Sequence, residues 1–166
     1  MDVESKILIA AISASSAIFG AVISQVVTVV RDWLDKKHQR NVLLRNKYEE
    51  LAGLITDSQE WGGSLLTSSS LKELRNKPPI NARKALILSY IYFPLLRSGC
   101  ENYITGCVNF QNVLIDNHEF KDGIDCGTQA IHKNEGAVLE SSSKLRESRQ
   151  DIDDLIIQYS SKYAKA

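Results

Sequence analysis

Cysteine is scarce in this chain of 166 residues. Its three cysteines, Cys100, Cys107 and Cys126, cannot all pair within one molecule. If Cys100 and Cys107 share a helix, they lie about 10 Å apart along its axis, beyond the roughly 7 Å that a disulfide allows between two Cα atoms. The cysteine pattern therefore argues against a disulfide framework and agrees with a reducing, cytoplasmic location.

Net charge and strand periodicity are also lacking. The 20 basic and 20 acidic residues cancel, so no dominant basic surface supports a nucleic-acid partner. No segment shows the sustained two-residue alternation of a β-strand, whereas helical periods recur along the chain. We therefore predict an all-α protein, with one N-terminal transmembrane helix followed by a small antiparallel bundle of about four helices.

Catalytic motifs are missing as well. The chain has no glycine-rich phosphate loop, nucleophile elbow or metalloprotease motif. A catalytic thiol would be Cys126 with His118 or His132 as its base, but the neighbouring Asp122 and Asp125 would raise rather than lower the thiol pKa. We predict no enzymatic activity and no catalytic residue.

A metal site would draw on Cys100, Cys107, His118 and Cys126, which are ligands of suitable type. Their spacing lacks the paired units that bring two ligands together on one turn. Cys100 and Cys107 fit better as small core residues one heptad apart. We predict neither a metal site nor a bound cofactor.

Charge is absent from residues 7–30, a run of twenty-four residues. As a helix this run is about 36 Å long, enough to cross a hydrocarbon core of about 30 Å with some tilt. We predict a transmembrane signal-anchor at 7–30, preceded by a short tail at 1–6.

A cleaved signal peptide is the alternative interpretation of the same segment. Lys6 would form its basic start, and the small residues 13–17 would form its cleavage site. However, the apolar run at 7–12 is short for such a peptide, and apolar sequence continues well beyond residue 17. The sequence favours the uncleaved anchor.

Basic residues follow the predicted span at once. Residues 31–47 contain six basic side chains against Asp32 and Asp35, a formal charge of +4, whereas the tail before Lys6 carries only acidic charges. Because basic flanks stay on the cytoplasmic side, we predict an external N-terminus and a cytoplasmic domain at 41–166, in the plasma (inner) membrane. The residues predicted to contact lipid head groups and set this topology are Arg31, Trp33, Lys36, Lys37 and Arg40.

Small residues recur every fourth position within the span, at Ser16, Gly20, Ser24 and Thr28. Such a side lets two helix backbones approach closely in lipid, and Gln25 adds an amide that is costly to leave unpaired there. We predict a homo-oligomer formed through this stripe. The alternative is that the stripe simply faces lipid.

The domain at 41–166 shows helical periods separated by turn signals. Leu44, Tyr48, Leu51 and Ile55 form an apolar stripe, which packs on its own domain or forms a short coiled coil. Gly62 and Gly63 are predicted to end that helix. The stretch 64–70 is predicted to be a loop, before a short helical turn at 71–76.

Three longer elements follow. A helix over 84–96 is predicted to be capped by Asn81 and kinked or ended near Pro94, and a second helix to cover 100–116. Residues 117–127 are predicted to form a turn. A helix of roughly 35 residues is then predicted from Thr128, on the apolar heptad of Ile131, Val138, Leu145, Ile152 and Tyr159.

Together these features predict a membrane-anchored helical interaction protein at the cytoplasmic face of the membrane. Its predicted partners are membrane lipid, further copies of itself and an unidentified protein. The alternative is a membrane-acting effector, which would assemble through its span and perturb the bilayer by inserting the apolar segment 85–96.

Overall fold

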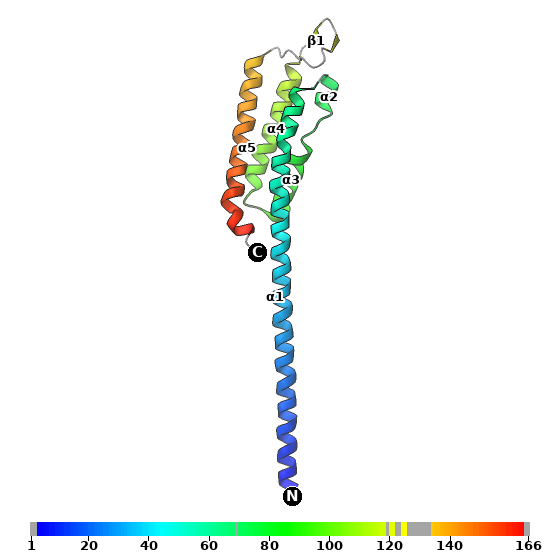
Figure 1. Cartoon of the computed structure of the whole chain (residues 1–166), viewed down its shortest axis with the longest axis vertical. Coiled ribbons are helices and arrows are strands. Elements are labelled where there is room, and N and C mark those ends of the chain that lie inside the picture. The colour runs from blue at the N-terminus through cyan, green and yellow to red at the C-terminus, as the bar shows by residue number, and fades with distance from the viewer. Residues whose placement is uncertain (1–2, 69, 119, 122–123, 126–133, 165–166) are drawn as a thin grey trace. The chain divides into compact units, whose positions relative to one another are not determined.

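The computed structural model describes residues 3–68, 70–118, 120–121, 124–125 and 134–164, without the side chains of 4–14, 17, 18 and the four strand residues. These residues divide into two units, Met1–Leu43 and Leu44–Ala166. The elements in chain order are α1 (Val3–Leu66), α2 (Leu71–Arg75), α3 (Ile80–Tyr92), α4 (Arg97–Asp116), β1 (Phe120–Lys121), β2 (Ile124–Asp125) and α5 (Glu135–Tyr163) (Figure 1). The prediction of a helical protein is confirmed.

The predicted membrane span gains no support from the described residues, among which no helix is both long and apolar enough to cross a membrane. Residues 7–30 fall within α1. The side chains at 7–14, 17 and 18 lie outside the described part, so the span remains a prediction from the sequence.

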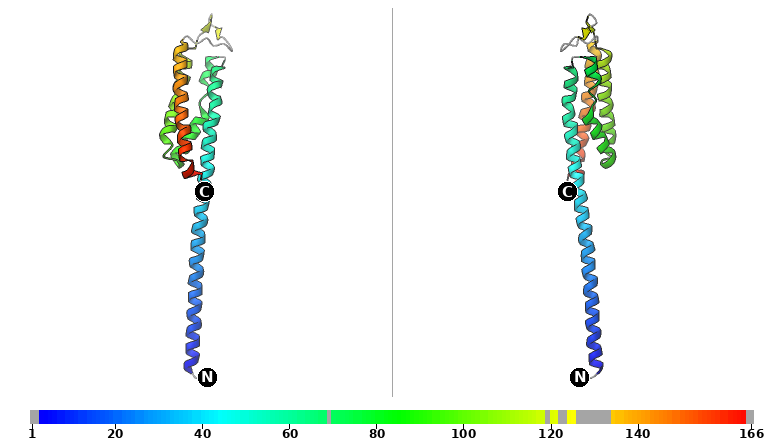
Figure 2. Two further views of the ribbon diagram at one scale, coloured as in Figure 1. Left: turned by 60° about the vertical axis from the view of Figure 1, so that its left-hand side comes forward. Right: turned by 90° about the vertical axis from the view of Figure 1, so that its right-hand side faces the viewer.

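Unit 44–166 is a bundle whose successive long helices alternate in direction, as Figures 1 and 2 show for α3, α4, α5 and the last part of α1. Its main core joins all four. The predicted stripe packs on its own domain, because Tyr48, Leu51 and Ile55 are buried. Burying each such side chain contributes about 1.5–3 kcal/mol. Their buried partners are Ala82, Ala85, Phe93, Leu96, Cys100, Tyr103, Cys107 and Ile152.

Two glycines set the spacing between α4 and α5. A Cβ on Gly99 would lie 2.7 Å from Leu155 Cδ1 and 2.9 Å from Ile152 Cδ1. A Cβ on Gly106, one heptad further on, would lie 2.7 Å from Ser148 Oγ. Real Cβ atoms do not pack this closely, so a side chain at either position would force a side chain of α5 to move.

Three aromatic rings join distant parts of the bundle. Phe93 follows α3, and its ring centroid lies 5.3 Å from that of Tyr48 and 5.0 Å from that of Tyr163. Tyr48 and Tyr163 are 5.5 Å apart, and the Tyr48 hydroxyl also donates a hydrogen bond to the Ile156 carbonyl. This cluster fixes the end of α5 against α1.

Several predicted boundaries are confirmed and two are wrong. The short helix and the stop before Pro94 are found as predicted, as α2 and the end of α3 at Tyr92. Gly62 and Gly63 do not end their helix, because α1 continues to Leu66. Asn81 is not the cap of α3, because that helix begins one residue earlier, after Pro79.

The region predicted as a turn holds a small hairpin. Phe120 pairs with Asp125 and Lys121 with Ile124 in an antiparallel ladder. Two residues per strand are too few to show the alternation that marks a strand in sequence. Thr128, the predicted cap of the last helix, and Ile131 lie outside the described residues. α5 begins after Asn134, whose side chain accepts a hydrogen bond from the Ala137 amide at 3.1 Å.

Candidate functional site

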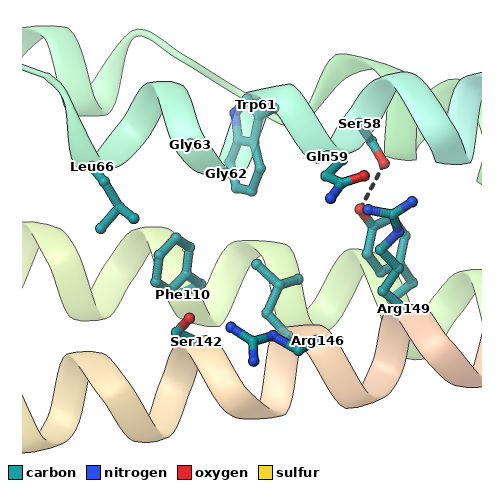
Figure 3. A pocket seen from close by; sticks show the side chains of 12 residues that line it. Ser58, Gln59, Trp61, Gly62, Gly63, Leu66, Phe110, Ser142, Arg146 and Arg149 are labelled. Carbon is teal, nitrogen blue, oxygen red and sulfur yellow. Dashed lines mark hydrogen bonds between the residues drawn. The ribbon is translucent and has the colours of Figure 1, made fainter.

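A cavity of about 210 Å³ lies between α1, α4 and α5 within unit 44–166. We call it the interhelical cavity. Its lining residues are Ser58, Gln59, Trp61, Gly62, Gly63 and Leu66 of α1, Tyr103 and Phe110 of α4, and Ser142, Leu145, Arg146 and Arg149 of α5. Figure 3 shows Ser58 and Arg149 toward one end, and Leu66 and Phe110 toward the other; the hydrogen bond drawn at Ser58 joins it to the Tyr103 hydroxyl. The cavity therefore has a polar end, at Ser58 and Arg149, and a more apolar end, at Leu66 and Phe110, beside which Ser142 and the Arg146 guanidinium also lie.

A buried hydroxyl pair closes the polar end. Ser58 Oγ lies 2.5 Å from the Ile55 carbonyl, to which it donates, and 2.6 Å from the Tyr103 hydroxyl. Since the single Ser58 proton goes to the carbonyl, Tyr103 must donate to Ser58. Burial raises the pKa of Tyr103 to about 12, so this proton stays in place at neutral pH.

Two arginines of α5 supply the cavity with positive charge and no carboxylate lines it. Arg149 Nε is buried and makes no hydrogen bond in the described part of the chain, although it pairs with Asp153 Oδ2 at 3.4 Å. Arg146 is exposed, and its guanidinium makes no ion pair or hydrogen bond with the described residues. A buried N–H without a hydrogen bond is costly.

Trp61 lines the cavity, and a hydrogen bond to the segment after α2 fixes the position of its ring. Its indole Nε1 donates to the Lys77 carbonyl at 2.7 Å. The same carbonyl accepts from Gln111 Nε2 at 3.2 Å, and that amide also donates to the Leu74 carbonyl at 2.6 Å. The segment after α2 therefore holds the Trp61 ring by a hydrogen bond, which prevents the ring from rotating into the cavity.

The predicted self-association residues lie on α1 in unit 1–43. Ser16, Gly20, Ser24 and Thr28 are all exposed, and the Thr28 hydroxyl donates to the Ser24 carbonyl at 2.9 Å. Such a bond to the preceding turn leaves the hydroxyl oxygen able to accept from a second helix. The stripe as an interface stays a prediction.

The predicted lipid-contact residues Arg31, Trp33, Lys36, Lys37 and Arg40 are also exposed. The structure brings four of them together around one surface hollow, which Trp33, Lys36, Lys37 and Arg40 line. Lys37 Nζ lies 5.3 Å from the centre of the Trp33 ring, within the range of a cation–π contact. An aromatic ring beside three cations suits the boundary between apolar and charged surroundings.

The thiols of Cys100 and Cys107 are free and buried, in agreement with their predicted role in the core. Burial raises the pKa of Cys100 to about 11 and that of Cys107 to about 12, so neither is a nucleophile at neutral pH. The described residues contain no cluster that could hold a metal ion. Cys126 and His132 lie outside those residues, so a role for them is untested.

No protein-family model, curated protein or solved structure matches this chain.

The interhelical cavity was missed by sequence reasoning because its residues come from segments up to about ninety positions apart. One signal was available. Gly62 and Gly63 both line the cavity, and a glycine pair inside a helix costs about 1 kcal/mol per residue compared with alanine. Because a glycine pair also predicts a helix end, the pair does not by itself indicate a cavity.

Proposed function

We propose that this chain is a single-pass, membrane-anchored helical interaction protein that acts at the cytoplasmic face of the membrane. The observation that carries the proposal is the order of three segments: the charge-free run 7–30, the basic residues of 31–47 and the folded unit 44–166. Nothing in that order requires catalysis. The anchor would concentrate the helical unit at the membrane, where a protein partner and lipid are both in reach.

Membrane attachment is tested by alkaline extraction of membranes from cells that express the full chain. A charge near the middle of a span costs about 2.5–3.5 kcal/mol, so Val22→Arg with Ile23→Arg should release the chain into the soluble fraction. The matched control is Val42→Arg with Leu43→Arg, which changes two exposed apolar residues beyond the run and should leave attachment intact. Release of the unmodified chain would refute the anchor.

Topology is tested by the access of protease to a C-terminal tag in intact cells. The tag should be protected in the unmodified chain, because the basic flank is retained inside. Replacing Lys36, Lys37 and Arg40 by glutamine, and adding three lysines before Ile7, should expose at least part of the tag. A tag that is digested in the unmodified protein would contradict the proposed orientation.

The interaction role is tested by co-purification from detergent-solubilised membranes. The control carries residues 1–40 fused to an unrelated helical domain, so it shares the anchor and lacks the 41–166 domain. A partner that is recovered with the full chain and is absent from the control supports the proposal. Recovery of the same proteins by both chains would assign any binding to the anchor alone.

A membrane-acting effector is the second candidate, and one observation favours it. Ile80, Ile87, Ile91 and Leu95 recur at intervals of seven, four and four along α3 and its end, with 40–63% of each exposed. Arg83 and Lys84 are exposed beside this stripe, as suits a helix that lies in a membrane surface.

The effector candidate is tested on the 41–166 fragment with anionic liposomes. Insertion predicts that the fragment partitions into the vesicles and that Ile87→Ser with Ile91→Ser abolishes this. Leu139→Ser, which removes an isolated apolar side chain 70% exposed on α5, is the control and should change nothing. A fragment that stays off the vesicles removes this candidate.

A further inference from the structure

We propose that the interhelical cavity binds a small monocarboxylate whose apolar body is aromatic or branched. The cavity lies wholly within unit 44–166, so this inference does not depend on the proposed membrane anchor. Its lining supplies three things that such a molecule needs: cationic side chains, apolar surface and open space beside them.

The charge of the cavity lining as a whole fits one negative charge. Arg146 and Arg149 both line the cavity, and Asp153 Oδ2, 3.4 Å from Arg149 Nε, offsets part of their positive charge. The local excess is therefore about one charge, which suits a carboxylate better than a doubly charged phosphate. Guanidinium groups bind carboxylates through paired N–H donors, and the exposed Arg146 guanidinium makes no ion pair with the described residues.

The apolar end fits a ring or a branched chain. Trp61, Leu66 and Phe110 contribute to its lining, and Trp61 is held in place by its bond to Lys77. An apolar cavity of about 150 Å³ is large enough for benzene. The 210 Å³ found here can therefore hold one ring with a short acidic chain, and it is smaller than the roughly 300 Å³ at which pockets for drug-sized ligands begin.

Packing does not explain why the cavity wall contains two glycines. Among the described residues, nothing lies within 4 Å of the position that a Cβ on Gly62 or Gly63 would take. At Gly99 and Gly106, by contrast, the missing side chain is what lets two helices touch. The absence of side chains at 62 and 63 instead keeps the space between α1 and α5 open, as binding requires.

The required chemistry, a carboxylate on an apolar body, has two possible sources. One is a free organic acid of the size of 3-phenylpropionate. The other is the C-terminal carboxylate of a peptide that ends in an apolar residue. Both place one anionic group beside an arginine of α5 and one apolar group against Trp61, and binding experiments can separate them.

The test uses the full-length chain with Trp33→Phe in phosphatidylcholine nanodiscs, so that Trp61 is the only indole of the two in the sequence. Fluorescence is titrated with 3-phenylpropionate and with 3-phenylpropanol, which has the same body without the charge. We expect saturable binding of the acid with Kd below about 1 mM, and at least tenfold weaker binding of the alcohol. The titration runs in buffer if the chain does not enter the bilayer, so failure of the anchor leaves this result readable.

Two sets of variants test the site itself. Arg146→Gln with Arg149→Gln should weaken binding of the acid at least tenfold and leave binding of the alcohol unchanged. Gly62→Leu should abolish binding by filling the cavity. Gly53→Leu is its matched control, because Gly53 is an exposed glycine of α1 that does not line the cavity and also has no described atom within 4 Å of its Cβ position.

The source is separated with acetyl-Gly-Gly-Phe carrying a free or an amidated C-terminus. Binding of the free tripeptide at least tenfold more tightly than 3-phenylpropionate assigns the cavity to a peptide end, and the reverse order assigns it to a free acid. Three results would each overturn the proposal: no saturable change with either acid, equal binding of acid and alcohol, or full binding by a folded Gly62→Leu variant.

Discussion

The close packing of α4 against α5 predicts that helix propensity and packing have opposite effects on stability when a glycine is replaced by alanine. Alanine is favoured over glycine inside a helix by about 1 kcal/mol, and this gain should apply equally at Gly53 and at Gly99. At Gly53 nothing described lies within 4 Å of the new Cβ, so Gly53→Ala should stabilise the protein by roughly 0.5–1 kcal/mol.

Gly99→Ala should do the opposite. Its Cβ would lie 2.7 Å from Leu155 Cδ1 and 2.9 Å from Ile152 Cδ1, and the Ile152 side chain is fully buried. Overpacking of this kind costs about 1–3 kcal/mol. Because the propensity gain cancels between the two variants, the difference in their free energies of unfolding reports the packing cost alone.

The assay is urea unfolding of the full-length chain in a non-ionic detergent, followed by circular dichroism at a helical wavelength. We expect Gly99→Ala to be about 1–3 kcal/mol less stable than Gly53→Ala, at equal slope. Gly99→Ala should cost less free energy of unfolding in a Leu155→Ala background than in the unmodified chain, because the nearest clashing atom is then missing. If Gly99→Ala raises stability as much as Gly53→Ala does, the inferred contact between α4 and α5 is wrong.

Three further predictions concern the core, the thiols and the small-residue stripe. Tyr48→Phe removes the hydrogen bond to the Ile156 carbonyl and should cost about 1 kcal/mol in urea unfolding; an unchanged midpoint would show that the bond contributes nothing. Burial raises the pKa of Cys107 from 9.0 to about 12. As the pH rises, the thiol therefore loses its proton in the unfolded state before it does in the folded state. The contribution of this thiol to the free energy of unfolding should be full below about pH 9 and fall as the pH rises toward 12. Cys107→Ala should flatten that fall between pH 9 and 10, and an equally steep fall would assign it to other groups. Gly20→Leu should weaken self-association in a membrane two-hybrid reporter while Phe19→Leu leaves it nearly intact; equal signals would exclude the stripe as an interface.

The sequence predicted best the features that depend on local periodicity. The apolar positions Tyr48, Leu51 and Ile55 are buried as their 4-3-4 spacing indicates, and Val138 and Ile152 are buried on the heptad of α5. Pro94 stops α3 because it has no N–H to donate. Each of these follows from one segment and its own backbone geometry.

What the sequence could not show depends on pairs of distant segments. Gly62 and Gly63 are helix breakers by local rules, yet α1 continues through them because Leu65 is buried against Phe110 and Leu114 in a second cluster. The interhelical cavity depends on three helices at once, because α4 and α5 meet through glycines and Gly62 and Gly63 leave part of α1 beside the cavity without side chains. No periodicity within one segment reports how far apart two helices stand.

The ring contact between Tyr48 and Tyr163 brings the beginning and the end of unit 44–166 together, with 5.5 Å between their centroids. A domain whose ends meet can be spliced into a surface loop of a host protein without stretching either chain. The same geometry should allow circular permutation, with the old ends joined by a short glycine-serine linker and new ends opened elsewhere. This unit is therefore suited to insertion into other proteins as an intact domain.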